Sequence, residues 1–114
     1  MATTHNTEKV GLTWSIKAVT AAISGQRFAK PDGAAASSGG NALGVTLYEI
    51  TSGDDMAVAI EGIVRIETVG AVAVNDEIQA GDGAKAFPLI SGKVKLGTAV
   101  TAASAAGEII LIKL

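Results

Sequence analysis

Residues 41–66 decide the fold and read NALGVTLYEITSGDDMAVAIEGIVRI. The stretch and its continuation hold three apolar runs, at 43–50, 56–60 and 63–68. Apolar side chains alternate with polar or small ones, and this period of two indicates strands, because successive side chains point to opposite faces of a sheet. Between the first two runs, a Gly that can take positive φ stands among Ser and Asp residues that can bond nearby backbone groups. We therefore predict an antiparallel meander at the centre of the chain.

Further strands are predicted on both sides of this centre. Residues 10–18 alternate in the same way, with Trp14 as the largest anchor. Pro88 predicts that the short apolar segment 87–90 lies at a sheet edge, because proline has no amide hydrogen to donate to a neighbouring strand. The chain closes on EIILIKL, residues 108–114, whose four consecutive aliphatic residues suggest a strand buried on both faces. With 14 glycines and two prolines, the pattern is typical of a small all-β fold with many tight turns.

The two halves of the chain echo each other. Each carries an apolar run, an Asp-Gly turn, an apolar-Gly strand and an aliphatic strand, in that order. The matching pairs are 28–33 with 78–83, 43–46 with 96–99, and Gly53 plus 56–60 with Gly107 plus 109–113. This order predicts an internal duplication of about fifty residues that builds a pseudo-twofold small antiparallel β-barrel or sandwich.

The first nine residues, MATTHNTEK, have no apolar period and no resemblance to a secretory signal. We expect residues 1–9 to form a flexible or extended arm, which could reach roughly 30 Å across a neighbouring subunit. The alternative is a frayed terminus. Residues 10–114 are expected to form a single β domain, a size that suits one core. No apolar run approaches the length that spans a bilayer, so we expect no membrane partner.

The sequence offers few groups for catalysis. It has no cysteine, which excludes thiol catalysis and thiolate metal sites. Its one histidine, His5, lies in the expected arm, where nothing rigid could orient it as a base or a metal ligand. The acidic pairs 54–55 and 76–77 stand beside turn residues and are interpreted as turn caps rather than as a cation loop. The glycine-rich stretch 38–44 lacks the Lys-Ser/Thr of a phosphate loop. We expect no enzyme activity, no metal, no cofactor and no small-molecule substrate.

Nucleic acid is also not expected as a partner. The net charge is −2, and Lys and Arg are scattered singly, whereas a duplex-binding surface needs clustered cations. One Trp, one Tyr and two Phe are too few for a platform on which bases stack. The pattern favours a compact β domain that packs against other protein surfaces.

Short glycine and valine elements follow one another along nearly the whole chain from Val10. After the polar arm they are Val19-Thr20, Gly25, Leu43-Gly44-Val45, Gly53-Asp54, Val58 to Gly62, Gly81-Asp82, Leu96-Gly97 and the closing aliphatic strand. In this order the chain resembles the small capsid cement, or head decoration, proteins of tailed bacteriophages. The resemblance implies a structural virion protein, made in the bacterial cytoplasm, that binds the major capsid protein on the outer capsid surface. It further implies a homotrimer that stabilises the expanded head.

The physical character of the chain agrees with that role. Three copies gain avidity from modest contacts, and a polar arm can become ordered on binding. We expect the capsid contact to involve the arm and the anchor of the first strand, at Thr4, His5, Asn6, Thr7, Glu8, Lys9, Val10 and Trp14. The alternative is a small β-rich module that binds a carbohydrate or another surface ligand as an adhesin, which would need an exposed aromatic patch or a carboxylate-lined groove.

Overall fold

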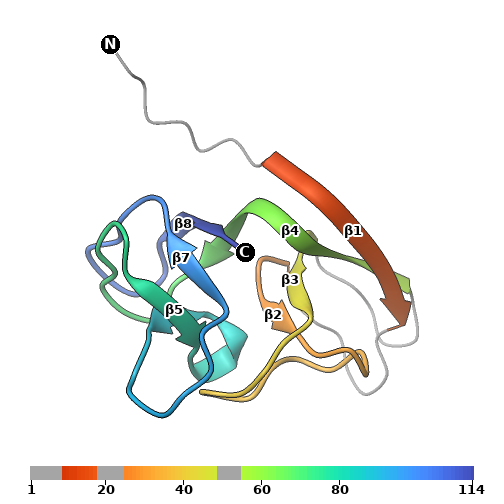
Figure 1. Ribbon diagram of the computed structural model, residues 1–114, viewed down its shortest axis with the longest axis horizontal. Coiled ribbons are helices and arrows are strands. Elements are labelled where there is room, and N and C mark those ends of the chain that lie inside the picture. The colour runs from red at the N-terminus through yellow and green to blue at the C-terminus, as the bar shows by residue number, and fades with distance from the viewer. Residues whose placement is uncertain (1–8, 18–24, 49–54) are drawn as a thin grey trace.

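The computed structural model of the chain describes residues 9–17, 25–48 and 55–114, with the backbone alone at 9, 14–17, 55 and 56. These residues form strands and one 3-10 turn: β1 (Lys9–Lys17), β2 (Phe28–Ala29), β3 (Gly44–Thr46), β4 (Asp55–Glu67), β5 (Glu77–Ala80), η1 (Asp82–Ala84), β6 (Ala86–Pro88), β7 (Gly97–Ala99) and β8 (Ile109–Lys113). The strands join in the order β2-β3-β4-β8-β7-β5-β6, and β1 pairs with β4 (Figure 1). All the strand pairs are antiparallel and the sheet is nearly closed, like a barrel, which confirms the predicted fold class.

The predicted three-stranded meander is wrong in one respect. The second and third apolar runs belong to one strand, β4, which continues through Gly62. Gly62 takes a φ of 107°, and the register of β1 against β4 shifts beside it, between Val10 and Thr13. A glycine inside a strand commonly marks such a bulge, where the strand bends without ending. The apolar runs at 56–60 and 63–68 were predicted to be separate strands of the meander.

The long strand β4 is shared by two groups of neighbours. Val58 pairs with Trp14 and with Thr46, so β1 and β3 lie on opposite edges of the first half of β4. Ile63 pairs with Lys9 and with Lys113, so β8 also lies opposite β1. β3 and then β8 therefore follow one edge of β4, while β1 runs along the other and stands on the outside of the molecule (Figure 1).

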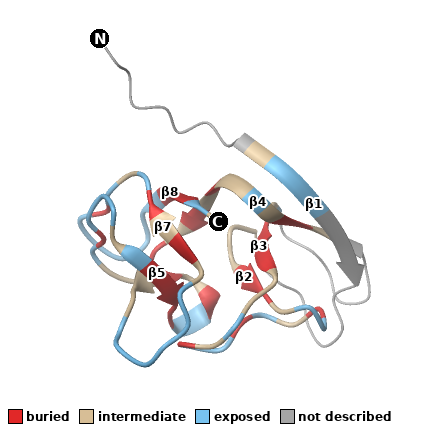
Figure 2. Ribbon diagram, viewed as in Figure 1, coloured by how far each residue is buried: buried red, intermediate tan, exposed pale blue. Residues whose placement is uncertain are grey.

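The core lies between the strands, where the buried segments of β2, β3, β5, β7 and β8 face one another (Figure 2). Its largest fully buried side chains are Phe28, Ile66, Ile78, Ile110, Ile112, Val45, Val58 and Val64. In β8 three residues in succession, 110–112, are buried, which confirms that this strand is covered on both faces. β6, which contains Pro88, ends the strand order, as the proline predicted.

The predicted repeat is present in the strand order. The first repeat, residues 9–62, holds β1, β2, β3 and the first half of β4, joined in the order β1-β4-β3-β2. The second repeat, residues 63–113, begins with the second half of β4 and joins as β4-β8-β7-β5. The last strand of the first repeat thus continues directly into the first strand of the second.

Hydrogen bonds outside the strands repeat in the same way. The amide of Gln26 donates to the Thr46 carbonyl, as the amide of Asn75 donates to the Ala99 carbonyl. Four further backbone hydrogen bonds of the first repeat have a counterpart in the second. Written from the donor amide to the acceptor carbonyl, with the first repeat before the second, they are Thr46 to Arg27 and Ala99 to Asp76, Leu43 to Ala29 and Leu96 to Ile78, Gly40 to Ser37 and Lys93 to Ile90, and Leu47 to Ala57 and Val100 to Leu111. The Asp-Gly turns match as well. The hydrogen bond from the Lys30 amide to the Ala34 carbonyl corresponds to that from Gly81 to Lys85, and the bond from Gly33 to Lys30 corresponds to that from Ala84 to Gly81.

These bonds correct the sequence alignment of the repeats by one residue in three places. Ala29 corresponds to Ile78 rather than to Gln79. Gly33 corresponds to Ala84 rather than to Gly83, and both take positive φ, at 88° and 63°. In the last strand Ala57 corresponds to Leu111. The alignment slipped because it matched glycine to glycine, whereas the hydrogen bonds fix the backbone conformation at each position.

Candidate functional site

The residues predicted at the capsid contact do not form one described cluster. Thr4, His5, Asn6, Thr7 and Glu8 lie outside the described residues. Lys9 and Val10 open β1 and pair with Ile63 and Gly62, and Val10 is half-buried against the core. Trp14 pairs in register with Val58, and its side chain lies outside the described part of the chain. The role of these residues in a contact stays a prediction.

The outer strand β1 is exposed at its start. It pairs along one edge with β4, and no strand in the described residues pairs with its other edge. Gly11, Leu12 and Thr13 are all exposed, and Leu12 has 47% of its surface in solvent. The register of β1 against β4 shifts along these residues, so the regular alternation is interrupted and three residues in succession lie in solvent. An unpaired edge of this length is a template for pairing with another chain.

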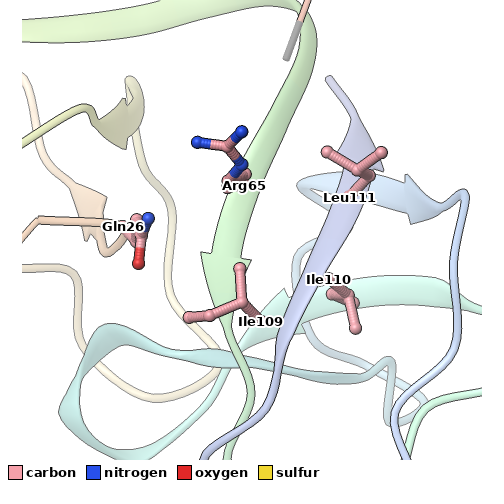
Figure 3. A pocket seen from close by; sticks show the side chains of 5 residues that line it. All are labelled: Gln26, Arg65, Ile109, Ile110 and Leu111. Atoms are coloured by element: carbon pink, nitrogen blue, oxygen red, sulfur yellow. The ribbon is translucent and has the colours of Figure 1, made fainter. Parts of the chain in front are cut away.

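A cavity of about 330 Å³ lies beside β4 and β8, where the turn before β2 approaches them. Its lining residues are Gln26, Arg65, Ile109, Ile110 and Leu111, which Figure 3 shows on the turn before β2, on β4 and on β8. Ile109 is 42% exposed at its rim, whereas Leu111 is buried. The cavity combines apolar side chains with one guanidinium and one amide, which suits packing against another surface more than it suits chemistry.

One carboxylate of the described core is held by two cations. Glu67, at the end of β4, lies 3.1 Å from Arg27 Nη2 and 3.0 Å from Lys85 Nζ. The hydrogen bond from Lys85 lowers the pKa of Glu67 below its ordinary value, and the charge of Arg27 acts in the same direction against partial burial. Because Arg27 belongs to the first repeat and Lys85 to the second, Glu67 links the two repeats. The sequence analysis missed this cluster, since its three residues are far apart in the chain and carry no spacing signal.

The described residues hold no group of three or more His, Asp or Glu side chains that could bind a metal ion. The single histidine, His5, is outside them. In the same described ranges, no helix is long and apolar enough to cross a membrane. Phe28 is buried and Phe87 half-buried, which leaves Tyr48 as the exposed aromatic of the described part. An aromatic sugar-binding patch therefore has no support among these residues.

The same strand arrangement occurs in a solved phage structure. The chain is similar to the crystal structure of the head fiber gp8.5 N base in bacteriophage phi29, with a TM-score of 0.74 and 15% sequence identity. The likeness covers 90% of this chain and 92% of that one. At this level of sequence identity, the structural similarity shows that the two proteins share a fold. No curated protein sequence matches the chain significantly.

A match at the level of the protein family covers almost the whole chain. Residues 5–114 match the family described as phage cement protein, so the match begins at His5 and includes both repeats and the final strand. The match agrees with the fold shared with the phi29 head fiber base. The chain belongs to the phage cement protein family, and is thus a structural protein associated with the phage capsid.

Proposed function

We propose that this chain is a decoration protein that binds the major capsid protein on the outer surface of the phage head and stabilises the expanded shell. In this proposal it acts as a homotrimer, without enzymatic activity. Residues 1–9 form the arm, and residues 10–114 form a single β domain. The observation that carries the proposal is the family match over residues 5–114, which includes the arm residues from His5 as well as the β domain.

The described fold supports a role in protein contact. β1 stands on the outside of the molecule, no strand in the described ranges pairs with its outer edge, and residues 1–8 precede it directly in the chain. A strand edge offers a row of backbone donors and acceptors, to which an extended partner segment can add. The arm, with Lys9, Val10 and Trp14 at its junction to the fold, is therefore the proposed capsid-binding element.

Stabilisation of the head follows from several weak contacts acting together. Each copy in a trimer contributes one arm and one domain surface, so the three contacts bind with a high effective concentration. A trimer that bridges neighbouring capsid subunits opposes their separation, because all of its contacts must break before the subunits move apart. No single contact needs to be strong.

Removing residues 1–8 tests the arm. The truncation ends before Lys9, so that the pairing of β1 with β4 is kept. We expect the melting temperature to stay within a few degrees of the full chain while affinity for expanded heads, measured by co-sedimentation, falls at least about tenfold. A full-length variant with Thr4, Asn6 and Thr7 changed to Ser is the control for chain length. Unchanged co-sedimentation of the truncated protein would contradict the role of the arm.

Capsid stabilisation has its own measurement. Expanded heads without the protein should release their DNA at a lower temperature than heads saturated with it, because ligand bound only to the intact shell stabilises that shell by mass action. Heads that bind the protein but melt at the same temperature would leave a decoration protein without a cementing role.

A further inference from the structure

Each repeat carries one Asp-Gly pair in its turn, Asp32-Gly33 in the first and Asp82-Gly83 in the second. An Asp-Gly pair can close a ring on itself. The amide nitrogen of the glycine attacks the Cγ atom of the aspartate, the carboxyl group loses one oxygen as water, and a five-membered succinimide forms. Glycine allows this approach because it has no side chain beside the nitrogen and restricts the backbone least. In a folded protein the reaction therefore depends on how the turn holds these atoms.

The ring reopens with water at one of its two carbonyl carbons. Attack at Cγ restores aspartate, whereas attack at the main-chain carbonyl leaves the chain running through Cβ and Cγ. The second product is isoaspartate, which keeps the mass and the carboxylate of aspartate but has one more carbon atom in the main chain. Ring closure releases one water and ring opening consumes one, so the change needs no oxidant, reductant or enzyme.

The two turns place their Asp-Gly pairs at different positions. In the first repeat the glycine of the pair, Gly33, donates its amide to the Lys30 carbonyl at 3.0 Å. In the second repeat the equivalent bond comes from Ala84, whose amide donates to the Gly81 carbonyl at 3.1 Å. Gly83 thus stands one residue before the hydrogen-bonded position of the turn. The same backbone turn therefore uses the amide of one glycine and not that of the other.

Both reacting groups of the first pair are held. Gly33 is buried, and its amide already has an acceptor. The Oδ1 atom of Asp32 accepts a hydrogen bond from the Ala34 amide at 3.1 Å, and its Oδ2 lies 3.8 Å from Lys30 Nζ. Ring closure at Asp32 would have to break these hydrogen bonds first, so the turn protects the pair.

Both reacting groups of the second pair are free within the described chain. Asp82 and Gly83 are exposed, and neither the Asp82 carboxylate nor the Gly83 amide has a hydrogen bond or ion pair there. The space around Gly83 is open, because a Cβ atom built on it would meet nothing nearer than the Lys85 side chain at 3.7 Å. No contact in this turn opposes the approach of the nitrogen to Cγ.

We propose that Asp82-Gly83 is a site of spontaneous isoaspartate formation in the folded protein, and that Asp32-Gly33 is protected from the same reaction by its turn. The chemical class of the modification is an intramolecular dehydration followed by hydrolysis. Its cause is the offset of one residue between the two Asp-Gly pairs. The inference depends neither on the oligomeric state nor on capsid binding.

The modification acts on a closed turn at the edge of the sheet. It inserts a main-chain carbon between Gly81 and Ala84, whose hydrogen bond closes the turn, and Ala84 is buried. The Gly81 amide also donates to the Lys85 carbonyl at 2.6 Å, directly before β6. We expect isoaspartate at position 82 to loosen the junction of β5 and β6. Because proteins of a released phage particle are not resynthesised, the change would accumulate with the age of the particle.

Peptide mapping of the full-length protein tests the proposal. The folded protein is incubated at neutral pH and digested with trypsin, which places Asp82 in peptide 66–85 and Asp32 in peptide 28–65, because Lys30 precedes proline and is not cut. Chromatography separates the isomers of equal mass, and electron-transfer fragmentation locates isoaspartate. We expect isoaspartate at 82 to form at least about tenfold faster than at 32, since two hydrogen bonds must break at Asp32. Equal rates, or a faster reaction at Asp32, would overturn the proposal.

The unfolded protein is the control for sequence. In concentrated urea both turns are lost, so the two pairs should react at rates within about twofold of each other. If the tenfold preference for Asp82 persisted in urea, the turns would not be its cause and the proposal would fail.

A matched pair of variants gives an independent measurement. Asp82→Asn and Asp32→Asn close the same ring with loss of ammonia, and the product then differs from the starting protein in mass. We expect D82N to deamidate at least about tenfold faster than D32N, because the geometry of each turn is unchanged. Circular dichroism checks that both variants are folded. Deamidation at equal rates in the two folded variants would contradict the role of the turns.

A third variant tests the effect on the sheet edge. Asp82→Glu keeps the charge, but glutamate would need a six-membered ring and should not react on the same time scale. After the same incubation the original protein should melt a few degrees lower than when fresh, whereas D82E should keep its melting temperature. A modified protein that melts as the fresh one does would overturn the proposed loosening of β5 and β6.

Discussion

The first and second repeats have the same strand order but differ in the segment after the Asp-Gly turn and in the neighbours of their first strands. In the second repeat the Asp-Gly turn leads into the strand β6, whereas in the first it leads only to a single bridge between Ala29 and Ala35. The turn at Gln26 and Arg27 contacts the end of β4 at Glu67, whereas no described strand pairs with the outer edge of β1. The difference teaches that the second repeat carries the more complete local structure, while the first carries the surface available to partners.

The largest difference in stability between the repeats is expected from alanine substitutions at the equivalent glycines of β3 and β7. A Cβ at Gly44 would overlap the Ala59 carbonyl oxygen, whereas a Cβ at Gly97 would lie 2.8 Å from the Lys113 carbonyl oxygen. We expect Gly44→Ala to lower the free energy of unfolding by more than about 3 kcal/mol, and Gly97→Ala by about 1 to 3 kcal/mol, from urea denaturation. Equal losses would show that the two repeats tolerate the same backbone separation.

Removing the charge that links the repeats should have a smaller effect. Glu67→Gln leaves Arg27 and Lys85 without their carboxylate and should cost about 1 to 2 kcal/mol at pH 7. The control is Glu77→Gln, whose partner Lys95 is about half exposed, and it should cost no more than about 0.5 kcal/mol. If Glu77→Gln lowered the free energy of unfolding as much as Glu67→Gln, the contacts of Glu67 with both repeats would add no stability beyond that of an exposed ion pair.

The same carboxylate predicts a pH dependence. The pKa of Glu67 is lower in the folded protein than its ordinary value of 4.5, so the folded state favours the ionised form. Its stabilising contribution is therefore complete above about 4.5 and is lost as the pH falls through the lower folded-state pKa. Thermal melts of the original protein and of E67Q should converge as the solution is acidified below this value. Curves that stay parallel would contradict the assignment.

The smallest effect is expected at the matched left-handed positions of the two turns. Gly33→Ala places a Cβ on a residue with φ of 88° and should cost about 1 kcal/mol. Ala84→Gly relieves the same strain at φ 63° but removes a buried methyl group and adds unfolded-chain entropy, so its net effect should stay within about 0.5 kcal/mol. Chemical denaturation of both variants checks whether the positions are equivalent.

The sequence predicted those parts of the fold that depend on local pattern. Alternation located β1, the aliphatic run located β8, and Pro88 marked the edge strand. The order of turns and strands predicted the repeat, because each repeat uses the same turn chemistry. Pattern alone could not distinguish a bulge from a turn at Gly62, since glycine serves both.

The candidate site was less accessible from sequence. The arm residues were chosen for their polarity and for a family resemblance, and they lie outside the described residues. The cluster around Glu67 depends on contacts between residues that are far apart in the sequence. Such relationships emerge only when register is known, because a shift of one residue exchanges the two faces of a strand.

The passage of β4 through Gly62 has a consequence for the folding unit. The boundary between the repeats falls inside a strand, so a cut there would interrupt β4 and divide one hydrophobic core, with Phe28 and Val45 in one fragment and Ile66 and Ile110 in the other. Each fragment would keep its own strand pairs but expose the part of the core that the other covers. The two halves of this chain are therefore complementary fragments rather than autonomous modules, and the protein is expected to gain or lose its structure as a whole.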